Sequence, residues 1–220
     1  MTHFFGYPTT HCRTIKGAGA RVRILNSEEA RRLIACAAPG IQPALIVALN
    51  TGMRRIEILS LNWRDVNFAK SFILIENSKN GKARKVPMND FVYRTLKEIP
   101  RLSSEHVFFN PETNDHVKDV KTAFHAACRR AEIKGLRLHD LRHTAASWMI
   151  AAGADLVTVK EILGHSSILM TMRYAHATPE NKRLAVEKLG PILDPTRQKV
   201  DNTPEAVIEI RAVSPLNLTH

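Results

Sequence analysis

Apolar residues recur at helical spacing along most of this chain, and the pattern changes to strand-like runs at one place. That place is SFILIEN, SKNGKARK and VPM, residues 71–88, where Asn80-Gly81 is the pair that tight hairpin turns prefer. On either side, apolar residues at i, i+3 and i+4 predict helices. This layout predicts a mainly helical α+β domain that carries one small antiparallel hairpin.

Cap signals and glycines set the expected limits of the helices. Asn26 or Ser27 caps the first helix, Pro39-Gly40 ends it, and Gly52 ends the second. The predicted helices cover residues 26–38, 41–51, 54–63, 89–99, 117–132, 139–152, 155–163 and 179–189, with a polar loop at 110–116. We expect a flexible leader at 1–21, one domain at 22–190, and a proline-containing tail at 191–220.

The charge of the chain points to a polyanionic partner. Its net charge is +11 with a pI near 9.9, which favours nucleic acid over membrane, although a generally basic surface is the simpler interpretation. The sequence has no apolar run of the roughly 18–20 residues that span a bilayer and no secretory signal, so we expect a cytoplasmic protein. Cys12, Cys36 and Cys128 are too far apart for a zinc motif and are interpreted as ordinary thiols.

The segment LRLHDLRHTAAS, residues 136–147, brings two histidines, an aspartate and an arginine together. His139 and His143 are spaced like two zinc ligands of an H-E-x-x-H helix, but that motif needs a glutamate where this chain has Asp140, and a third ligand. His139 and Arg142 could instead hold a phosphate. The local pattern leaves a metal site, a phosphate site and a purely structural histidine pair open.

Two other segments carry cations that suit a phosphate. Arg54 and Arg55 follow Gly52 at a helix junction, where a guanidinium can bind a phosphate through two nitrogens. Pairing of Arg54 with Glu57 or Asp65 is the simpler interpretation. The hairpin turn is surrounded by Lys79, Lys82, Arg84 and Lys85. It is either a slim basic tip that enters a DNA groove or an ordinary solvated turn.

The segment LGHSSILMTMRYAH supplies a possible nucleophile. His165 follows a glycine, and Tyr174 lies nine residues later. A tyrosine hydroxyl can attack phosphorus when a base takes its proton and cations hold the phosphate. Taken alone, Tyr174 would more often be a packed or interfacial residue.

In this order and at this spacing, the segments resemble the active-site motifs of the tyrosine recombinases, the phage integrase family. The matching motifs are TGMRRIEILSLNWRDV, the basic hairpin before VP, LHDLRHTAAS, LGHSS and TMRYAH, and the resemblance covers residues 22–190. It implies the catalytic-domain fold of the DNA breaking-rejoining enzymes. It also implies a site-specific recombinase or integrase that cuts and rejoins DNA through a 3′-phosphotyrosine, with no metal or other cofactor. The implied partner is double-stranded DNA, bound by a homotetramer that is monomeric in solution, with no membrane and no small-molecule substrate.

The resemblance also implies a role for each matching residue. Arg54 and Arg142 match the arginines that clamp the phosphate, Tyr174 the nucleophile, and His165 a hydrogen-bond donor to the phosphate. Lys79, with Lys82 as the alternative, matches the acid for the leaving 5′-oxygen, and His139 matches the proton acceptor for the tyrosine. Glu57 and Asp140 match carboxylates that orient the arginine and the histidine. Lys82, Arg84 and Lys85 are expected to contact DNA.

Two alternatives stay open beside the recombinase. One is an enzyme like the type IB topoisomerases, which nicks and religates without exchanging strands. The other is an inactive DNA-binding remnant of an integrase. Family members usually carry a helical core-binding domain of about a hundred residues before the catalytic domain, and we expect this chain to lack it.

Overall fold

The computed structural model describes residues 14–15, 22–76, 83–101, 104–110, 115–117, 119–175, 183, 186–187 and 189. Contacts divide the chain into two units, residues 1–176 and 177–220, and all elements named here belong to the first. The helices are α1 (Ser27–Ala35), α2 (Gln42–Thr51), α3 (Arg55–Leu59), α4 (Asp90–Glu98), α5 (Lys121–Arg130), α6 (Asp140–Ala151), α7 (Leu156–Leu163) and α8 (Leu169–Met172), with a 3-10 turn at Trp63–Asp65. The mainly helical prediction is confirmed.

A three-stranded antiparallel sheet in the order β3-β4-β5 contains the predicted hairpin. The strands are β3 (Val66–Asn67), β4 (Phe72–Ile75) and β5 (Arg84–Pro87). Phe72 pairs with Pro87 and Ile75 pairs with Arg84, as expected for a hairpin, while β3 was not predicted. The turn itself, residues 77–82, lies outside the described residues. Two short pairs complete the strands: β1 (Thr14–Ile15) with β2 (Val22–Arg23), and β6 (Phe109–Asn110) with β7 (Asp115–His116).

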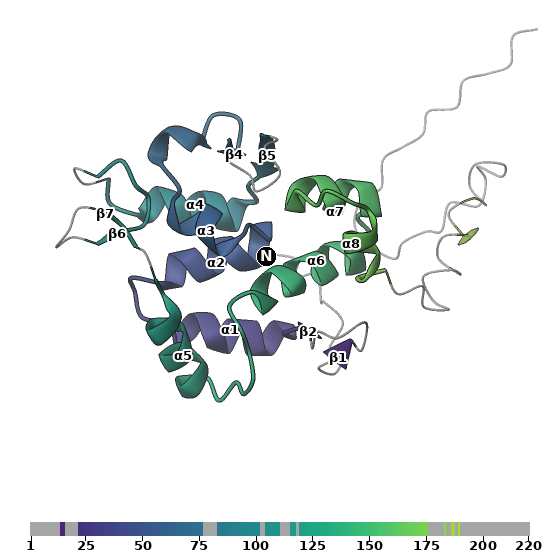
Figure 1. The fold of residues 1–220 in the computed structure, drawn as a ribbon, viewed down its shortest axis with the longest axis horizontal. Helices are drawn as coiled ribbons and strands as arrows, with labels where there is room; N and C mark the ends of the chain where they lie inside the picture. The colour runs from purple at the N-terminus through teal and green to yellow at the C-terminus, as the bar shows by residue number, and fades with distance from the viewer. Residues whose placement is uncertain are drawn as a thin grey trace, which may run out of the picture. The chain divides into compact units, whose positions relative to one another are not determined.

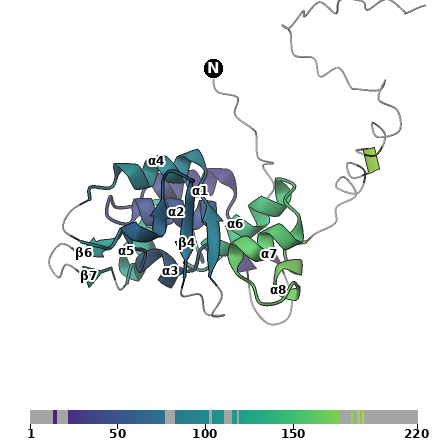
Figure 2. The ribbon, with the colours of Figure 1, turned by 90° about the horizontal axis from the view of Figure 1, so that it is seen from above.

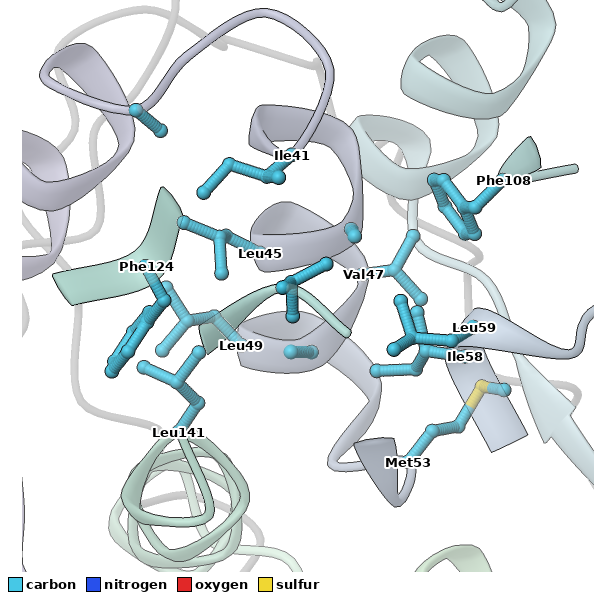
Figure 3. Close-up of a cluster of buried hydrophobic side chains, with 14 of the residues drawn as sticks. Ile41, Leu45, Val47, Leu49, Met53, Ile58, Leu59, Phe108, Phe124 and Leu141 are labelled. Atoms are coloured by element: carbon cyan, nitrogen blue, oxygen red, sulfur yellow. The ribbon is translucent and has the colours of Figure 1, made fainter. Parts of the chain in front are cut away.

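The core is built around α2, which is apolar on nearly every side. Leu45 and Leu49 face Phe124 of α5 and Leu141 of α6, while Val47 lies towards α3, as Figure 3 shows. A helix that is apolar all round must be buried all round, which explains its central position. In Figures 1 and 2, α6 lies between α2 and α7 and contacts both.

Two glycines end helices where the backbone turns left-handed. Gly52 after α2 has φ +64° and Gly164 after α7 has φ +65°, values that glycine adopts without a steric penalty. A Cβ on Gly52 would lie 2.5 Å from Cδ2 of Leu163, so the carboxyl ends of α2 and α7 meet closely. This approach brings backbone carbonyls of both helices to the amino end of α6.

Several sequence expectations differ from the structure or lie outside it. Thr14 and Ile15, within the expected leader, pair with β2, and α8 was not predicted. The rest of the leader, most of the helix expected at 179–189, and the tail at 191–220 lie outside the described residues. Within the part of the chain that is described, no helix has the length and apolar character needed to cross a bilayer.

Candidate active site

Arg54 lies at the start of α3, where Glu57 holds it twice. Its main-chain N–H donates to Glu57 Oε2 at 2.8 Å, and its Nη1 donates to Glu57 Oε1 at 2.8 Å. Its other terminal nitrogen, Nη2, donates to the carbonyl of Gly164 at 3.0 Å. The Arg54–Glu57 ion pair that the sequence suggested is therefore present. Glu57 also binds Arg84, so the pair belongs to a larger group of charged side chains.

Arg142, in the first turn of α6, is 5% exposed. It donates from Nη1 to the carbonyl of Gly52 and from Nη2 to that of Leu163, both at 2.7 Å. Burial and the nearby charge of Arg54 lower the pKa of Arg142 to about 10, so it stays a cation at neutral pH. Carbonyl oxygens are neutral, so these two hydrogen bonds do not cancel the charge of Arg142, which stays available to attract an anion.

Arg84 does not project from the hairpin as a surface cation. Its side chain is 9% exposed, and its Nη1 and Nη2 donate to the two Glu57 oxygens at 3.0 and 2.7 Å. Its Nε donates to the carbonyl of Ile162 at 2.9 Å. Arg84 pairs with Ile75 at the start of β5, the strand that contacts α7. Its side chain therefore binds groups inside the protein, whereas the sequence led us to expect a contact with DNA.

Three successive carbonyls at the end of α7 thus bind three arginines. Those of residues 162, 163 and 164 accept from Arg84, Arg142 and Arg54 respectively. The last carbonyls of a helix lack partners within the helix and form the negative end of its dipole. The N–H groups of Gly164 and His165 already satisfy the carbonyls of Lys160 and Glu161, so the arginines take the next three.

Glu57 is the carboxylate that joins two of these arginines. Burial alone would raise its pKa, but hydrogen bonds from Arg84 and Arg54 outweigh that effect and hold the pKa below its usual value. Glu57 is therefore ionised at neutral pH. Arg142 is the third guanidinium of the group and has no hydrogen bond to this carboxylate, so the group carries an excess of positive charge suited to an anion.

Three histidines lie beside the arginines. His165 directly follows the Gly164 cap and bonds through Nδ1 to Thr171 Oγ1 at 2.9 Å, which leaves Nε2 for a phosphate. His139 precedes α6 and packs edge-on against His143, with 4.8 Å between ring centroids. Burial and then the Arg142 charge lower the pKa of His139 and lower that of His165 to about 4.

Tyr174 follows α8 and is 4% exposed. Its hydroxyl forms a hydrogen bond with Nδ1 of His143, a buried residue on α6. Burial raises the pKa of Tyr174, and the charges of Arg173 and Arg142 only partly oppose this effect. The phenol therefore keeps its proton until another group removes it.

Asp140 and Lys85 form their described contacts outside the group of arginines and histidines. The Asp140 carboxylate accepts from the main-chain N–H of Arg137 at 2.8 Å, which closes the turn into α6. This contact differs from the expected one, in which Asp140 orients an arginine or a histidine directly. Lys85 is exposed, and its ammonium lies 5.1 Å from the centroid of the Phe72 ring. Lys79 and Lys82 lie outside the described residues.

A family model described as the phage integrase family matches residues 23–181, most of the chain and every described site residue. The chain belongs to the phage integrase family. It is 36% identical to the integrase of Salmonella phage P22 over 73% of this chain and 45% of that protein. It is 30% identical to the tyrosine recombinase XerA of Pyrococcus horikoshii over 74% of this chain and 60% of that protein. The chain thus spans about half the length of these relatives.

Solved structures of the family share the fold. The catalytic domain of bacteriophage HP1 integrase superposes with a TM-score of 0.62 and 34% identity, covering 79% of this chain and 98% of that one. The XerA recombinase gives 0.61 with 25% identity over 76% of this chain and 65% of that one. The match with the HP1 domain shows that the described elements correspond to an integrase catalytic domain.

The integrase-family site also contains residues that sequence reasoning missed. His143 was considered as a metal ligand or as part of a structural histidine pair, and its contact with Tyr174 joins α6 to the segment that follows α8. The only sequence signal was its position next to Arg142. Among the described residues, no three His, Cys, Asp or Glu side chains converge as a metal site would require.

Proposed function

We propose that this chain is a site-specific DNA recombinase that cuts and rejoins DNA through Tyr174. The observation that carries the proposal is a buried tyrosine hydroxyl beside a group of arginines whose charge exceeds that of Glu57. An excess of fixed positive charge in a water-poor site stabilises the negative charge that develops on a phosphoryl group in the transition state.

Arg54 and Arg142 would bind the non-bridging oxygens of one DNA phosphate, exchanging carbonyl partners for phosphate. His165 would donate a further hydrogen bond to the phosphate. The Tyr174 oxygen attacks phosphorus, and the bond to the 5′-oxygen breaks, which leaves a 3′-phosphotyrosine and a 5′-hydroxyl. Lys79 is the proposed acid for that oxygen, with Lys82 as the alternative. Rejoining reverses these steps, so the link needs no ATP.

The surface near the site suits a nucleic acid. An open hollow between β5 and the end of α7 has Lys85, Lys160 and His165 in its lining. Structures of the Tn1549 transposon integrase, which share the fold with a TM-score of 0.63 at 22% identity, are described as complexes with circular intermediate DNA. We infer that the partner is double-stranded DNA and that the chain forms a homotetramer on that DNA. We also infer a cytoplasmic location, where such DNA resides. The names of the relatives favour a recombinase over a topoisomerase.

Trapping of the covalent intermediate tests the proposal. The probe is a pool of nicked duplexes of randomised sequence, and adducts are captured on a denaturing gel in excess EDTA, because the proposed cations are arginines. We expect adduct from the wild-type chain, none from Tyr174→Phe, and a wild-type amount from Tyr93→Phe, which removes a hydroxyl on α4. DNA retention on a filter should be equal for all three.

Two results would contradict the proposal. An adduct formed by Tyr174→Phe would remove Tyr174 as the nucleophile. Adduct formation that stops in EDTA and returns with zinc or magnesium would show that the site needs a metal.

A further inference from the structure

The Tyr174 hydroxyl contacts His143, although the family resemblance implies that His139 takes its proton. His143 is 8% exposed and Tyr174 is 4% exposed, so bulk water has little access to the contact. The two rings lie 5.7 Å apart between centroids at 44°, and Nδ1 of His143 meets the phenolic oxygen. The hydroxyl that must lose a proton therefore already has a ring nitrogen beside it.

The fold fixes this pair from two sides. His143 lies on α6 directly after Arg142, whose guanidinium is held by Gly52 and Leu163. Tyr174 packs with Val159 and Leu163 of α7 and Ala146 of α6. His139 packs on the His143 ring at 87°. His143 therefore contacts both His139 and Tyr174.

Burial and the charges around His143 keep its imidazole neutral. Burial, followed by the charges of His139, Arg173, Arg142 and His165, lowers its pKa to about 4. A neutral imidazole has one nitrogen with a free lone pair, which can accept a proton. A phosphate bound by the arginines would oppose their charge and raise the pKa of His143, making it a stronger base when substrate is present.

Building on the proposed function, we propose that His143 is the catalytic residue that accepts the Tyr174 proton during strand cleavage. The hydroxyl proton moves to His143 Nδ1 as the phenolic oxygen bonds to phosphorus. The phosphorus–5′-oxygen bond breaks at the same time, and that oxygen takes its proton from the hairpin lysine. Religation returns the His143 proton to the tyrosine oxygen. The step requires the tautomer of His143 with its hydrogen on Nε2.

Single-turnover adduct formation on the duplex that the wild-type chain enriches from the randomised pool tests this assignment. His143→Ala removes the ring, while His143→Asn keeps an oxygen near the place of Nδ1 that can hold the hydroxyl but not take its proton. We expect both variants to slow adduct formation by about 10²–10⁴-fold, the usual range for acid–base catalysis, with DNA binding unchanged. Imidazole in the buffer should partly restore His143→Ala. His125→Ala, on α5 outside the site, should match the wild type.

Specific results would overturn the assignment. A near-wild-type rate for His143→Asn would mean that His143 only positions the hydroxyl. Rescue of His139→Ala by imidazole, without rescue of His143→Ala, would make His139 the acceptor. If His143→Ala does not fold, nitrogen-15 NMR of the wild-type histidines decides the question, because hydrogen on Nδ1 of His143 contradicts the proposal. In all of these outcomes the wild-type chain still forms the covalent adduct through Tyr174. If the proposed function itself is wrong, the wild-type chain forms no adduct, or forms one that does not depend on Tyr174.

Discussion

At the scale of single residues, the site holds ionisable groups in states that differ from those in water. The pKa of His143 and that of His165 are both lowered to about 4, because burial and neighbouring arginines disfavour a further positive charge. An unfolded chain would return both imidazoles to a pKa near 6.5. Folding stability is therefore linked to pH through these two side chains.

Acidification should weaken the fold between about pH 6.5 and pH 4. In that window the unfolded chain binds protons that the folded chain does not, so the free energy of unfolding falls as pH falls, by at most about 1.4 kcal/mol per pH unit for each histidine. Urea unfolding at about pH 7, 6 and 5 measures this decline. His165→Asn should make it shallower. A free energy of unfolding that stays level or rises on acidification would contradict the prediction.

The hairpin lysine can be identified by atom replacement in the DNA. An alkoxide leaves poorly without an acid, so Lys79→Ala should slow cleavage by about 10²–10⁴-fold. Sulfur at the bridging 5′ position leaves as a thiolate and needs no acid, so this substrate should restore Lys79→Ala. Arg54→Ala, which loses a contact to non-bridging oxygens, should gain much less. If the sulfur substrate restores only Lys82→Ala, Lys82 is the acid. If it restores neither variant, the hairpin only contacts DNA and does not supply the acid.

Arg84 and His143 show what residue patterns could not reveal. The sequence grouped Arg84 with the lysines around a basic turn, but the register of β5 directs it to Glu57, a partner 27 residues earlier in the chain. His143 was spaced like a zinc ligand, and its Tyr174 contact depends on how α8 returns to α6. By contrast, the sequence already placed Arg54, Arg142, His165 and Tyr174 in one candidate site, because their motifs have fixed local spacing.

At the scale of elements, the end of α7 organises the arginines. Gly164 is left-handed, and a Cβ there would lie 3.0 Å from both Cδ and Nη1 of Arg84. The glycine thus permits two things at once, the helix cap and the close approach of Arg84. Gly153 has φ +94°, but a Cβ there would meet no atom within 4 Å, so it shares only the backbone requirement.

Gly164→Ala and Gly153→Ala form a matched pair. Left-handed backbone strain should cost each variant about 1–2 kcal/mol of stability, measured by urea unfolding. Only Gly164→Ala should also displace Arg84, and we expect its covalent adduct formation to fall on the order of tenfold or more, equivalent to about 1.4 kcal/mol in the barrier. Equal adduct formation by the two variants would show that the Arg84 approach does not matter for cleavage.

Elements with strong local signals were predictable, and those that depend on tertiary contacts were not. Asn26 and Glu29 form the reciprocal cap that starts α1, and the apolar run and Gly52 define α2. The short α8 and the two-residue strands β3, β6 and β7 carry too few residues for a periodic pattern. They form where packing against longer elements favours them.

At the scale of the whole molecule, a net charge of +11 should dominate the proposed encounter with DNA. Because the chain spans about half the length of its relatives, we expect weak, salt-sensitive binding from these 220 residues alone. The logarithm of the binding constant should fall with the logarithm of salt concentration, with a slope of about −0.9 for each phosphate neutralised. Fluorescence anisotropy with the enriched duplex and a scrambled duplex measures this. Tight binding to the enriched duplex alone at physiological salt would contradict it.

The binding of three arginines by main-chain carbonyls has a consequence for how this protein tolerates mutation. Every amino acid provides a carbonyl, so exchanging Ile162 or Leu163 for another apolar residue alters packing but removes no acceptor. An insertion or deletion within α7 is different, because one residue turns the following helix end by about 100° and moves all three acceptors together. Helix length, more than the identity of its side chains, is therefore the property of α7 that variation must preserve.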